Sequence, residues 1–380
     1  MKSICFITGT RADYGILAPI MKEVAESRKV ALQIIATNMH LSADYGMTVK
    51  EIEGDGFKVD KKISSLISGG TAHATVLSMA KVEEGLAEAL QELKPDLVVI
   101  LGDRYEALSS ASAAVVYTIP VAHLHGGEIT EGAIDDKFRN AITQLSTYHF
   151  ASTMENAGRI ISMGADPSNV FHSGAPGAEV SEKDIDEETA RKFYEKTGII
   201  PGEPFILFAM HPVTTLPDKG EKEVKVALEA LDHFITQGYK ILVTMPNSDP
   251  GTKIITDLLS QWGESKPEKI IRVKSLGSTL FHFAMEMASV IAGNSSAALI
   301  EAPSYRLPAV NIGIRQKGRT HGITVFDVPA VKQRIITALD AALSLEMKAV
   351  VMGQPISVLN PYYKKESSKF IAEKLIEIVN

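Results

Sequence analysis

The sequence has little of what marks secreted, membrane-spanning or nucleic-acid-binding proteins. It contains one cysteine, Cys5, so no disulfide can form within the chain, and the apolar run 4–7 around it favours a buried, unreactive thiol. No apolar stretch has the length of a signal peptide or a membrane span, so we expect a cytoplasmic protein that does not bind membranes. The formal net charge of -7 argues against a general nucleic-acid-binding surface.

Length and composition indicate a globular protein of two domains. The chain has 380 residues, which is more than one hydrophobic core usually serves. Its contents of 45% apolar and 22% charged residues are ordinary for folded proteins. Between residues 173 and 204 the composition changes, and this stretch is rich in glycine, proline and charged residues. We place the domain boundary there.

Apolar runs alternate with helical patterns in both halves, which predicts an α/β fold with two doubly wound parallel sheets and a cleft between their strand ends. Predicted strands of the first half cover 3–8, 31–37, 96–101, the region of Val121, 149–152 and 169–172, with helices at 15–27, 45–53, 72–93, 105–116 and 138–145. Predicted strands of the second half cover 205–210, 240–245, 269–273, 290–292 and 309–312, with helices near 183–196, at 297–302 and at 365–378.

The first predicted strand leads directly into a glycine turn, 9–13, that carries Arg11. A helix that follows such a turn presents free N–H groups, so the turn suits a phosphate group. It lacks the G-x-G-x-x-G spacing of dinucleotide-binding proteins, and the second strand is followed by Asn38 rather than by an acidic residue. We therefore expect no nicotinamide, and we predict neither a cofactor nor a metal.

The stretch 120–150 holds the densest group of polar side chains at a predicted strand end. Its candidate functional residues are His123, His125, Glu128, Asp135 and Asp136. Because ligands of parallel α/β proteins bind at the carboxyl ends of strands, these residues are placed to act on one. The structural alternative is that Asp135 caps the next helix and that Asp136 pairs with Arg139 on its surface. Two imidazoles and three carboxylates so close together exceed what a cap requires.

Asp103 and His211 also follow predicted strands, at 96–101 and 205–210. Asp103 either caps the helix 105–116 or belongs to a site, and the two roles are compatible. The imidazole of His211 comes at a strand end rather than inside a core, which favours a functional role.

Three further features of the second half suit a nucleotide. A Gly-Asn-Ser-Ser loop places Ser295 and Ser296 at a helix start, where hydroxyls either cap the helix or bind phosphate oxygens. Glu301, on the same predicted helix, either accepts hydrogen bonds from a ribose diol or lies on a solvated face. The run 312–319 clusters Arg315 with two more cations in an acidic protein, which suits a diphosphate, and a surface charge run is the alternative.

These motifs, in this order, resemble the hydrolysing UDP-N-acetylglucosamine 2-epimerases of the sialic-acid pathway. The resemblance covers nearly the whole chain and rests on TGTRADYG at 8–15, LGDRYEAL at 101–108, HLHGGEITEGAIDD at 123–136, HPVTT at 211–215, GNSS at 293–296, EAPSY at 301–305 and NIGIRQKGR at 311–319. It implies two Rossmann-like domains of glycosyltransferase-B type. The first would be 1–176 with the C-terminal helix 364–380 packed back on it, and the second, 177–363, would bind most of the UDP.

The resemblance also implies residue roles. UDP would be bound by Arg11, His211, Asn247, Phe281, Ser295, Ser296, Glu301 and Arg315, with Phe281 stacking on uracil. Acid–base catalysis would fall to Asp103, Glu128, Asp135 and Asp136, with His125 and His211 as further candidates. Some relatives carry a glutamate where His125 stands, so the identity of the base stays open. Other departures are Ala298, Asn140 and Tyr363-Lys364, which we expect to tune the substrate or loops rather than to abolish activity.

The implied reaction converts UDP-N-acetylglucosamine into N-acetylmannosamine and UDP, by elimination to 2-acetamidoglucal and then hydration. The C2 hydrogen becomes removable only as the C1–O bond breaks, so Arg11, His211 and Arg315 would first stabilise the departing diphosphate. Three alternatives remain open: the same chemistry on UDP-2,4-diacetamido-2,4,6-trideoxyglucose of the legionaminic-acid pathway, a glycosyltransferase, and a non-catalytic nucleotide-sugar-binding protein. As partners we expect a UDP-sugar, UDP and further copies of the chain in a dimer or tetramer.

Overall fold

The chain folds into two compact units, which are described separately. The computed structural model describes residues 1–180 and 186–380. Unit 1 comprises residues 1–128, 135–177 and 364–380, and unit 2 comprises residues 129–134 and 178–363. The short segment 129–134 therefore belongs to unit 2, although its neighbours in the chain on both sides belong to unit 1.

Within the described residues, unit 1 is built on a seven-stranded parallel sheet of order β3-β2-β1-β4-β5-β6-β7. The strands are β1 (Ser3–Thr8), β2 (Ala31–Thr37), β3 (Lys61–Ile63), β4 (Leu97–Leu101), β5 (Val121–Leu124), β6 (Tyr148–Ala151) and β7 (Val170–His172). β1, β4 and β5 are buried over their whole lengths, as strands between two layers of helices should be. The strand order reverses between β1 and β4, which is where such sheets bind ligands.

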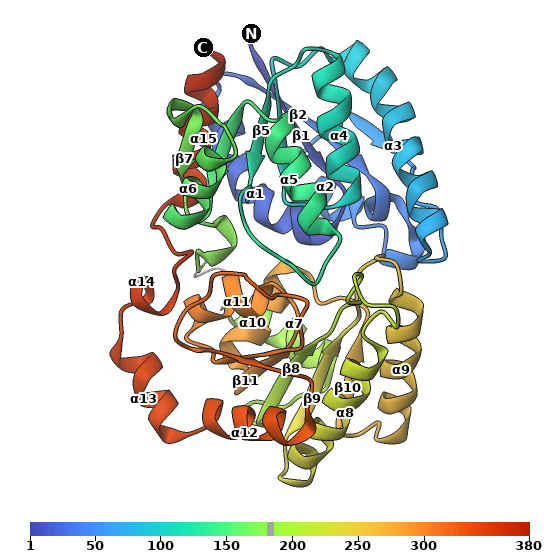
Figure 1. The fold of residues 1–380 in the computed structure, drawn as a ribbon, viewed down its shortest axis with the longest axis vertical. Coiled ribbons are helices and arrows are strands. Elements are labelled where there is room, and N and C mark those ends of the chain that lie inside the picture. Colours follow the sequence, from blue (N-terminus) through green and yellow to red (C-terminus); the bar gives the residue numbers. More distant parts are fainter. Residues whose placement is uncertain (181–185) are drawn as a thin grey trace. The chain divides into compact units, whose positions relative to one another are not determined.

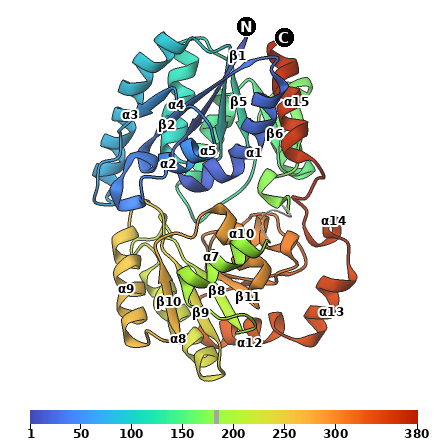
Figure 2. The same cartoon turned by 180° about the vertical axis from the view of Figure 1, so that it is seen from behind.

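Helices cover both faces of this sheet (Figures 1 and 2). On one face, α1 (Arg11–Ser27), α2 (Val49–Gly54) and α15 (Ser367–Val379) share one apolar cluster with the strands. On the other, α3 (Ala72–Leu93), α4 (Tyr105–Val116) and α5 (Asp135–Leu145) share a second cluster, which includes Cys5, and α6 (Met154–Ser162) packs beside β6 and β7. The C-terminal helix α15 packs against α1, so the last helix of the chain completes the first unit.

α1 begins at Arg11, four residues before the predicted start at Gly15. The Thr10 hydroxyl accepts a hydrogen bond from the Asp13 N–H at 3.2 Å, and the Asp13 carboxylate accepts one from the Thr10 N–H at 3.0 Å. This capping box satisfies two backbone donors and starts the helix inside the expected turn. Arg11 therefore lies in the first turn of α1, where the free N–H groups are.

Unit 2 repeats the plan of unit 1. Within the described residues its parallel sheet has six strands in the order β10-β9-β8-β11-β12-β13. They are β8 (Phe205–Ala209), β9 (Lys240–Thr244), β10 (Ile270–Val273), β11 (Val290–Gly293), β12 (Ala309–Ile312) and β13 (Val325–Val328). The order reverses between β8 and β11. The predicted class, two doubly wound Rossmann-like domains, is confirmed.

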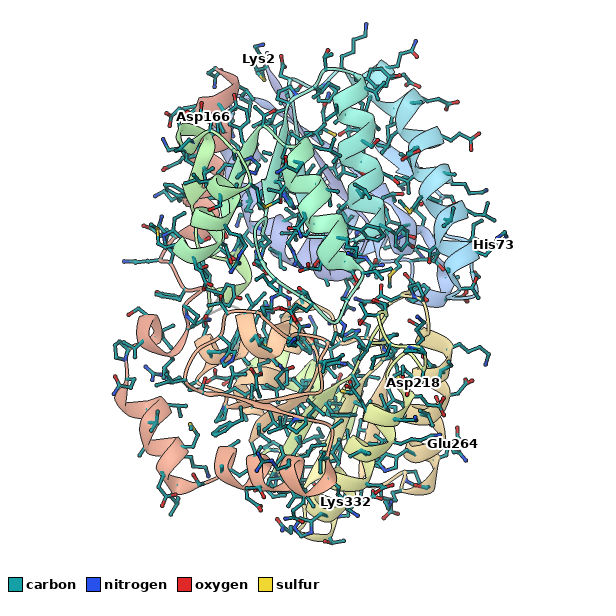
Figure 3. All side chains as sticks on the ribbon, viewed as in Figure 1. Lys2, His73, Asp166, Asp218, Glu264 and Lys332 are labelled. Carbon is teal, nitrogen blue, oxygen red and sulfur yellow. The ribbon has the colours of Figure 1, made fainter. Side chains whose placement is uncertain are left out.

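Two helical layers enclose the second sheet. One contains α8 (Glu221–Thr236), α9 (Thr252–Ser265) and α12 (Lys332–Ala342), and the other contains α7 (Glu187–Thr197), α10 (Ser278–Met287) and α11 (Ala297–Ile300). α13 (Leu345–Gly353) and α14 (Ile356–Leu359) follow α12 and lead to the C-terminal part of the chain. Charged side chains such as Glu264 and Lys332 are exposed and point outward (Figure 3).

Several predicted elements differ from the structure. The edge strands β3 and β13 were not predicted, because they are short and only partly apolar. The expected helix at 45–53 is two pieces, a 3₁₀ turn at Ala43–Tyr45 and α2. α11 ends at Ile300, so Glu301 lies just beyond the helix rather than within it. The helix expected near 183–196 begins at Glu187, and the part of that prediction at 183–185 lies outside the described residues.

The packing of α15 on unit 1 can be tested by a cavity mutation. Leu375 is fully buried, whereas Leu345 is 78% exposed. Leu375→Ala should lower the free energy of unfolding by about 2–5 kcal/mol, because it removes buried methyl groups and leaves a cavity, while Leu345→Ala should change it by less than about 0.5 kcal/mol. Urea titrations of both variants measure this. Equal stabilities of the two would contradict the packing of α15 into the core of unit 1.

Candidate functional site

In unit 1, a fully buried arginine connects three of the predicted residues. Arg139, on α5, donates hydrogen bonds to the carboxylate of Asp103, to that of Asp136 at 3.4 Å and to the backbone carbonyl of Glu128 at 2.9 Å. Asp103 does not cap α4, whose N-cap is Arg104. The Asp136–Arg139 pair exists as expected, but it is wrong to place it on the surface, because the Arg139 side chain is 0% exposed.

His123 holds the turn that carries Asp103. Its imidazole is fully buried at the sheet, and Nε2 lies 2.7 Å from the carbonyl oxygen of Gly102. Gly102 has a φ of 78°, a conformation that favours glycine. Burial lowers the pKa of His123 to about 3, and the Gly102 carbonyl only partly opposes that effect. His123 therefore stays neutral and acts on the site through the Gly102–Asp103 turn.

His125 and Glu128 form a buried pair after β5. Nδ1 of His125 lies 2.7 Å from Oε1 of Glu128, and the Ser152 hydroxyl donates to the same oxygen at 2.6 Å. Asn156 supports this arrangement by donating to the Ser152 hydroxyl at 3.0 Å. A carboxylate can only accept hydrogen bonds, so Nδ1 of His125 donates to Glu128, and in the neutral form of the ring the lone pair then lies on Nε2.

Nε2 of His125 is buried and has no hydrogen-bond partner among the described residues. The backbone at His125 has a φ of 65°, which is rare for a residue other than glycine. A buried polar atom without a partner is costly, and strained residues with such atoms concentrate at functional sites. The ring of His125 is thus oriented and able to accept a proton at Nε2.

The end of β1 contributes a second group of charges to unit 1. Arg11, in the first turn of α1, lies 3.8 Å from Glu51, and burial lowers the pKa of Arg11 without neutralising it. Burial, and next the nearby charge of Glu106, raise the pKa of Asp13 to about 6. Glu106 is itself paired with Arg104 at 2.7 Å. Both β1 and β4, the strands at the point of reversal, therefore end in charged residues.

In unit 2, Asn294 connects the ends of β8 and β11. Its carboxamide accepts from the N–H of His211 at 2.7 Å and donates to the carbonyl of His211 at 2.9 Å. The preceding Gly293 has a φ of 131°, and a Cβ there would lie 2.0 Å from the carbonyl oxygen of Ala209. Only glycine permits this close approach of the two strand ends.

The backbone carbonyl of Asn294 also accepts hydrogen bonds from the cationic loop that follows β12. Arg315 donates to it at 3.0 Å and Gln316 at 2.9 Å. The hydroxyl of Ser295 accepts from the Ala297 N–H at 3.4 Å, and Ser296 is the N-cap of α11 without a side-chain bond to it. His211, Ser295, Ser296 and Arg315 thus come from three loops at one edge of the sheet, as predicted.

The other predicted nucleotide residues lie in the same unit. Glu301 is 3.3 Å from Nε2 of His282, whose ring packs on Tyr305 with centroids 5.6 Å apart. Phe281 is a partly buried member of the α10 cluster. Asn247, in the loop after β9, accepts a hydrogen bond from Thr252 through its backbone carbonyl.

Sequence reasoning missed the residues that hold these loops. Arg139 was considered only as the surface partner of Asp136 in the structural alternative, and no role was assigned to Ser152, Asn156 or Asn294. Asn294 and His211 are 83 positions apart in the chain, and Ser152 and Glu128 are 24 positions apart. No local pattern signals such pairs. Among the described residues, no cluster of histidine, cysteine and acidic side chains is placed to hold a metal ion, and no helix has the length and apolar character to span a membrane.

Two Rossmann-like units with polar loops at both points of strand reversal define a protein of the glycosyltransferase-B type. A solved structure of UDP-GlcNAc 2-epimerase from Neisseria meningitidis, bound to UDP-GlcNAc, superposes with a TM-score of 0.81 and covers 99% of this chain and 100% of its own at 18% identity. At that identity the likeness establishes the fold alone.

The sequence identifies the family. The profile of the UDP-N-acetylglucosamine 2-epimerases matches residues 22–376. The hydrolysing UDP-N,N'-diacetylbacillosamine 2-epimerase of Legionella pneumophila is 35% identical over 348 residues, which are 90% of this chain and 89% of that protein. A UDP-N-acetylglucosamine 2-epimerase of Neisseria meningitidis serogroup B is 30% identical over 347 residues, 91% and 88% of the two chains. The chain belongs to the UDP-N-acetylglucosamine 2-epimerase family.

The neutral state of His123 makes stability depend on pH. An unfolded histidine takes up a proton below about pH 6.5 and folded His123 does not, so the stability it contributes is present above that pH and is lost as the pH falls toward 3. The loss has a slope of about 1.4 kcal/mol per pH unit. His123→Gln removes this dependence, and the exposed His73→Gln should not. Urea unfolding at pH 7 and pH 5 measures it. Parallel losses in wild type and His123→Gln would contradict a neutral His123.

Proposed function

We propose that the protein is a hydrolysing 2-epimerase, which releases UDP from a UDP-linked 2-acetamido sugar and inverts the configuration at C2. The observation that carries this proposal is the His125–Glu128 pair, an oriented base whose buried Nε2 has no partner among the described residues. Family membership over nearly the whole chain supports the same reaction class. Membership in this family also disfavours the two other functions considered, a glycosyltransferase and a non-catalytic nucleotide-sugar-binding protein.

The first candidate substrate is UDP-N,N'-diacetylbacillosamine, a 2,4-diacetamido-2,4,6-trideoxy sugar nucleotide. The relative named for it is 35% identical, against 30% for the relative named for UDP-N-acetylglucosamine. UDP-N-acetylglucosamine, which would yield N-acetylmannosamine for sialic-acid synthesis, is the second candidate, and the name of the family favours it. Both sugars carry the C1 diphosphate and the C2 acetamido group on which the chemistry depends.

The reaction begins with departure of the diphosphate. The C1–O bond breaks and UDP leaves with its electron pair, so negative charge grows on the phosphate. Arg11, His211 and Arg315 would oppose that charge, and Ser295 and Ser296 would donate hydrogen bonds to it. Glu301, next to His282, would bind the ribose diol, and Phe281 would stack on uracil. Asn294 takes no part in the chemistry but sets the positions of His211 and Arg315.

The C2 proton leaves as positive character grows at C1, and a C1–C2 double bond forms. Nε2 of His125 would accept this proton, because Glu128 already orients the ring and stabilises the imidazolium that results. Water then adds its oxygen to C1 and gives up a proton to the solvent, while an acid delivers a proton to the opposite face of C2; the imidazolium and the spent acid then exchange protons with the solvent to restore the enzyme. Asp103, Asp135 and Asp136 are the candidates for that acid, and Arg139 holds two of them through Asp103 and Asp136.

Incubation of the protein with each UDP-sugar in D₂O, without an acceptor, tests the reaction. We expect UDP and the free 2-epimeric sugar, with deuterium at C2, because the C2–H bond breaks in the elimination. Mass spectrometry and NMR identify the products. Free sugar without deuterium would indicate plain hydrolysis at C1, a requirement for an acceptor would indicate a transferase, and an intact substrate with tightly bound UDP would indicate a binding protein. Each of these outcomes overturns the proposal.

A histidine variant tests the assignment of the base. His125→Gln keeps an N–H group for Glu128 but cannot take up a proton. We expect kcat to fall by about 10²–10⁴-fold, while the Kd for UDP changes by less than about twofold because His125 is not among the proposed nucleotide ligands. The matched control is His73→Gln, on the exposed end of α3 (Figure 3). A His125→Gln enzyme with wild-type kcat would return the role of base to a carboxylate.

A further inference from the structure

The segment 129–134, Ile-Thr-Glu-Gly-Ala-Ile, is bound to unit 2 although the chain on both sides of it belongs to unit 1. Glu128 precedes the segment by one peptide bond, and Asp135 follows it by one. Both flanking residues are candidate catalytic carboxylates. The contacts of this short segment therefore bear directly on where those two side chains can lie.

One set of contacts joins the segment to the loop that carries Arg315. The N–H of Glu131 donates to the carbonyl of Lys317 at 3.0 Å, and the two side chains form an ion pair at 2.7 Å. Both side chains are at least half exposed, so the ion pair itself contributes little, and the backbone bond fixes the register. The segment is thus joined to the loop 313–318 by one backbone hydrogen bond and one ion pair.

A second set joins the segment to the loop that carries His211. The N–H of Ile134 donates to the hydroxyl of Thr214 at 2.8 Å. The hydroxyl of Thr215 donates to the carbonyl of Gly132 at 2.8 Å. Both threonines belong to the His-Pro-Val-Thr-Thr loop after β8. The six-residue segment is therefore hydrogen-bonded to two of the loops that carry proposed diphosphate ligands, those of His211 and Arg315.

Gly132 permits the closest approach. A Cβ built there would lie 2.3 Å from the carbonyl oxygen of Ile314 and 2.5 Å from Cα of Arg315. Both neighbours are backbone atoms, which cannot swing away as a flexible side chain could. Gly132 thus rests directly on the backbone of Arg315, and any larger residue must lift the segment or displace the loop.

We infer that the segment 129–134 positions the catalytic carboxylates from the nucleotide-binding unit, so that the loops holding the diphosphate also hold Glu128 and Asp135. The inference rests on the proposed function, because it assigns His211 and Arg315 to the diphosphate. A nucleotide that orders these two loops orders the segment bonded to both, and with it the residues at each end. A nucleotide bound to unit 2 would thereby affect the positions of Glu128 and Asp135 through the covalent chain.

Substitutions at Gly132 and Thr215 test the inference by kinetics. Gly132→Ala should lower kcat by about 100-fold, because small displacements of catalytic groups are that costly, and leave the Kd for UDP within about threefold. The matched control is Gly158→Ala on α6, where a Cβ meets no atom within 4 Å. Thr215→Val, which lacks the hydroxyl, should lower kcat by about two- to tenfold, and Thr215→Ser should restore it. Wild-type kcat in both Gly132→Ala and Thr215→Val would overturn the inference.

Hydrogen exchange tests the same inference without relying on turnover. In the wild type, UDP should slow amide exchange in 209–216 and 313–318 and also in 125–128 and 135–136. In Gly132→Ala the first two segments should stay protected and the last two should lose protection. If UDP leaves 125–128 and 135–136 unprotected in the wild type, or protects them equally in Gly132→Ala, the inference fails. Failure of wild-type protein to turn over either UDP-sugar would instead count against the proposed function.

Discussion

Hydrogen bonds of buried polar side chains position the functional loops of both units. In unit 2 the buried side chain of Asn294 connects the loops after β8 and β11, at the point of strand reversal, and in unit 1 the buried side chain of Arg139 connects the loops after β4 and β5. Leaving such a group without partners costs about 1–3 kcal/mol or more. The loops are therefore held at the positions that satisfy these two side chains, and His211, Arg315, Asp103 and Asp136 are placed as a consequence.

Most of the fold follows from local sequence, because buried parallel strands are nearly continuous apolar runs and their helices have a clear apolar face. β12 and α4, for instance, have the bounds that their patterns predict. The failures have local causes as well. β3 is an edge strand of which two residues in three are lysine, so it does not read as a strand. α1 starts early because Thr10 and Asp13 form a capping box, a signal that apolar periodicity does not contain.

The candidate site could be located from the sequence but not resolved. Polar residues that directly follow apolar runs, such as Asp103 and His211, identify the carboxyl edge of each sheet. Which of them contact one another depends on pairs that are distant in the chain, such as Asp103 with Arg139, 36 positions apart. The structural alternative put Arg139 on the helix surface, because a helix pattern does not reveal that its side chain reaches Asp103 after β4 and the carbonyl of Glu128 after β5. Because Arg139 is buried, its ion pairs with Asp103 and Asp136 lie within the candidate site and hold these two carboxylates in place.

The surroundings of the His125–Glu128 pair favour proton transfer at a single atom. Burial lowers the pKa of His149 to about 4 and that of His123 to about 3, so both neighbours remain uncharged near neutral pH and neither repels a new cation. Oε1 of Glu128 accepts hydrogen bonds from His125 and from Ser152. This oxygen therefore orients the His125 ring and has little remaining capacity to bind a substrate. A carboxylate held in this way is suited to stabilising an imidazolium beside it. In the proposed reaction His125 and Glu128 would therefore act together, with Nε2 of His125 taking up the proton and Glu128 stabilising the charge that results.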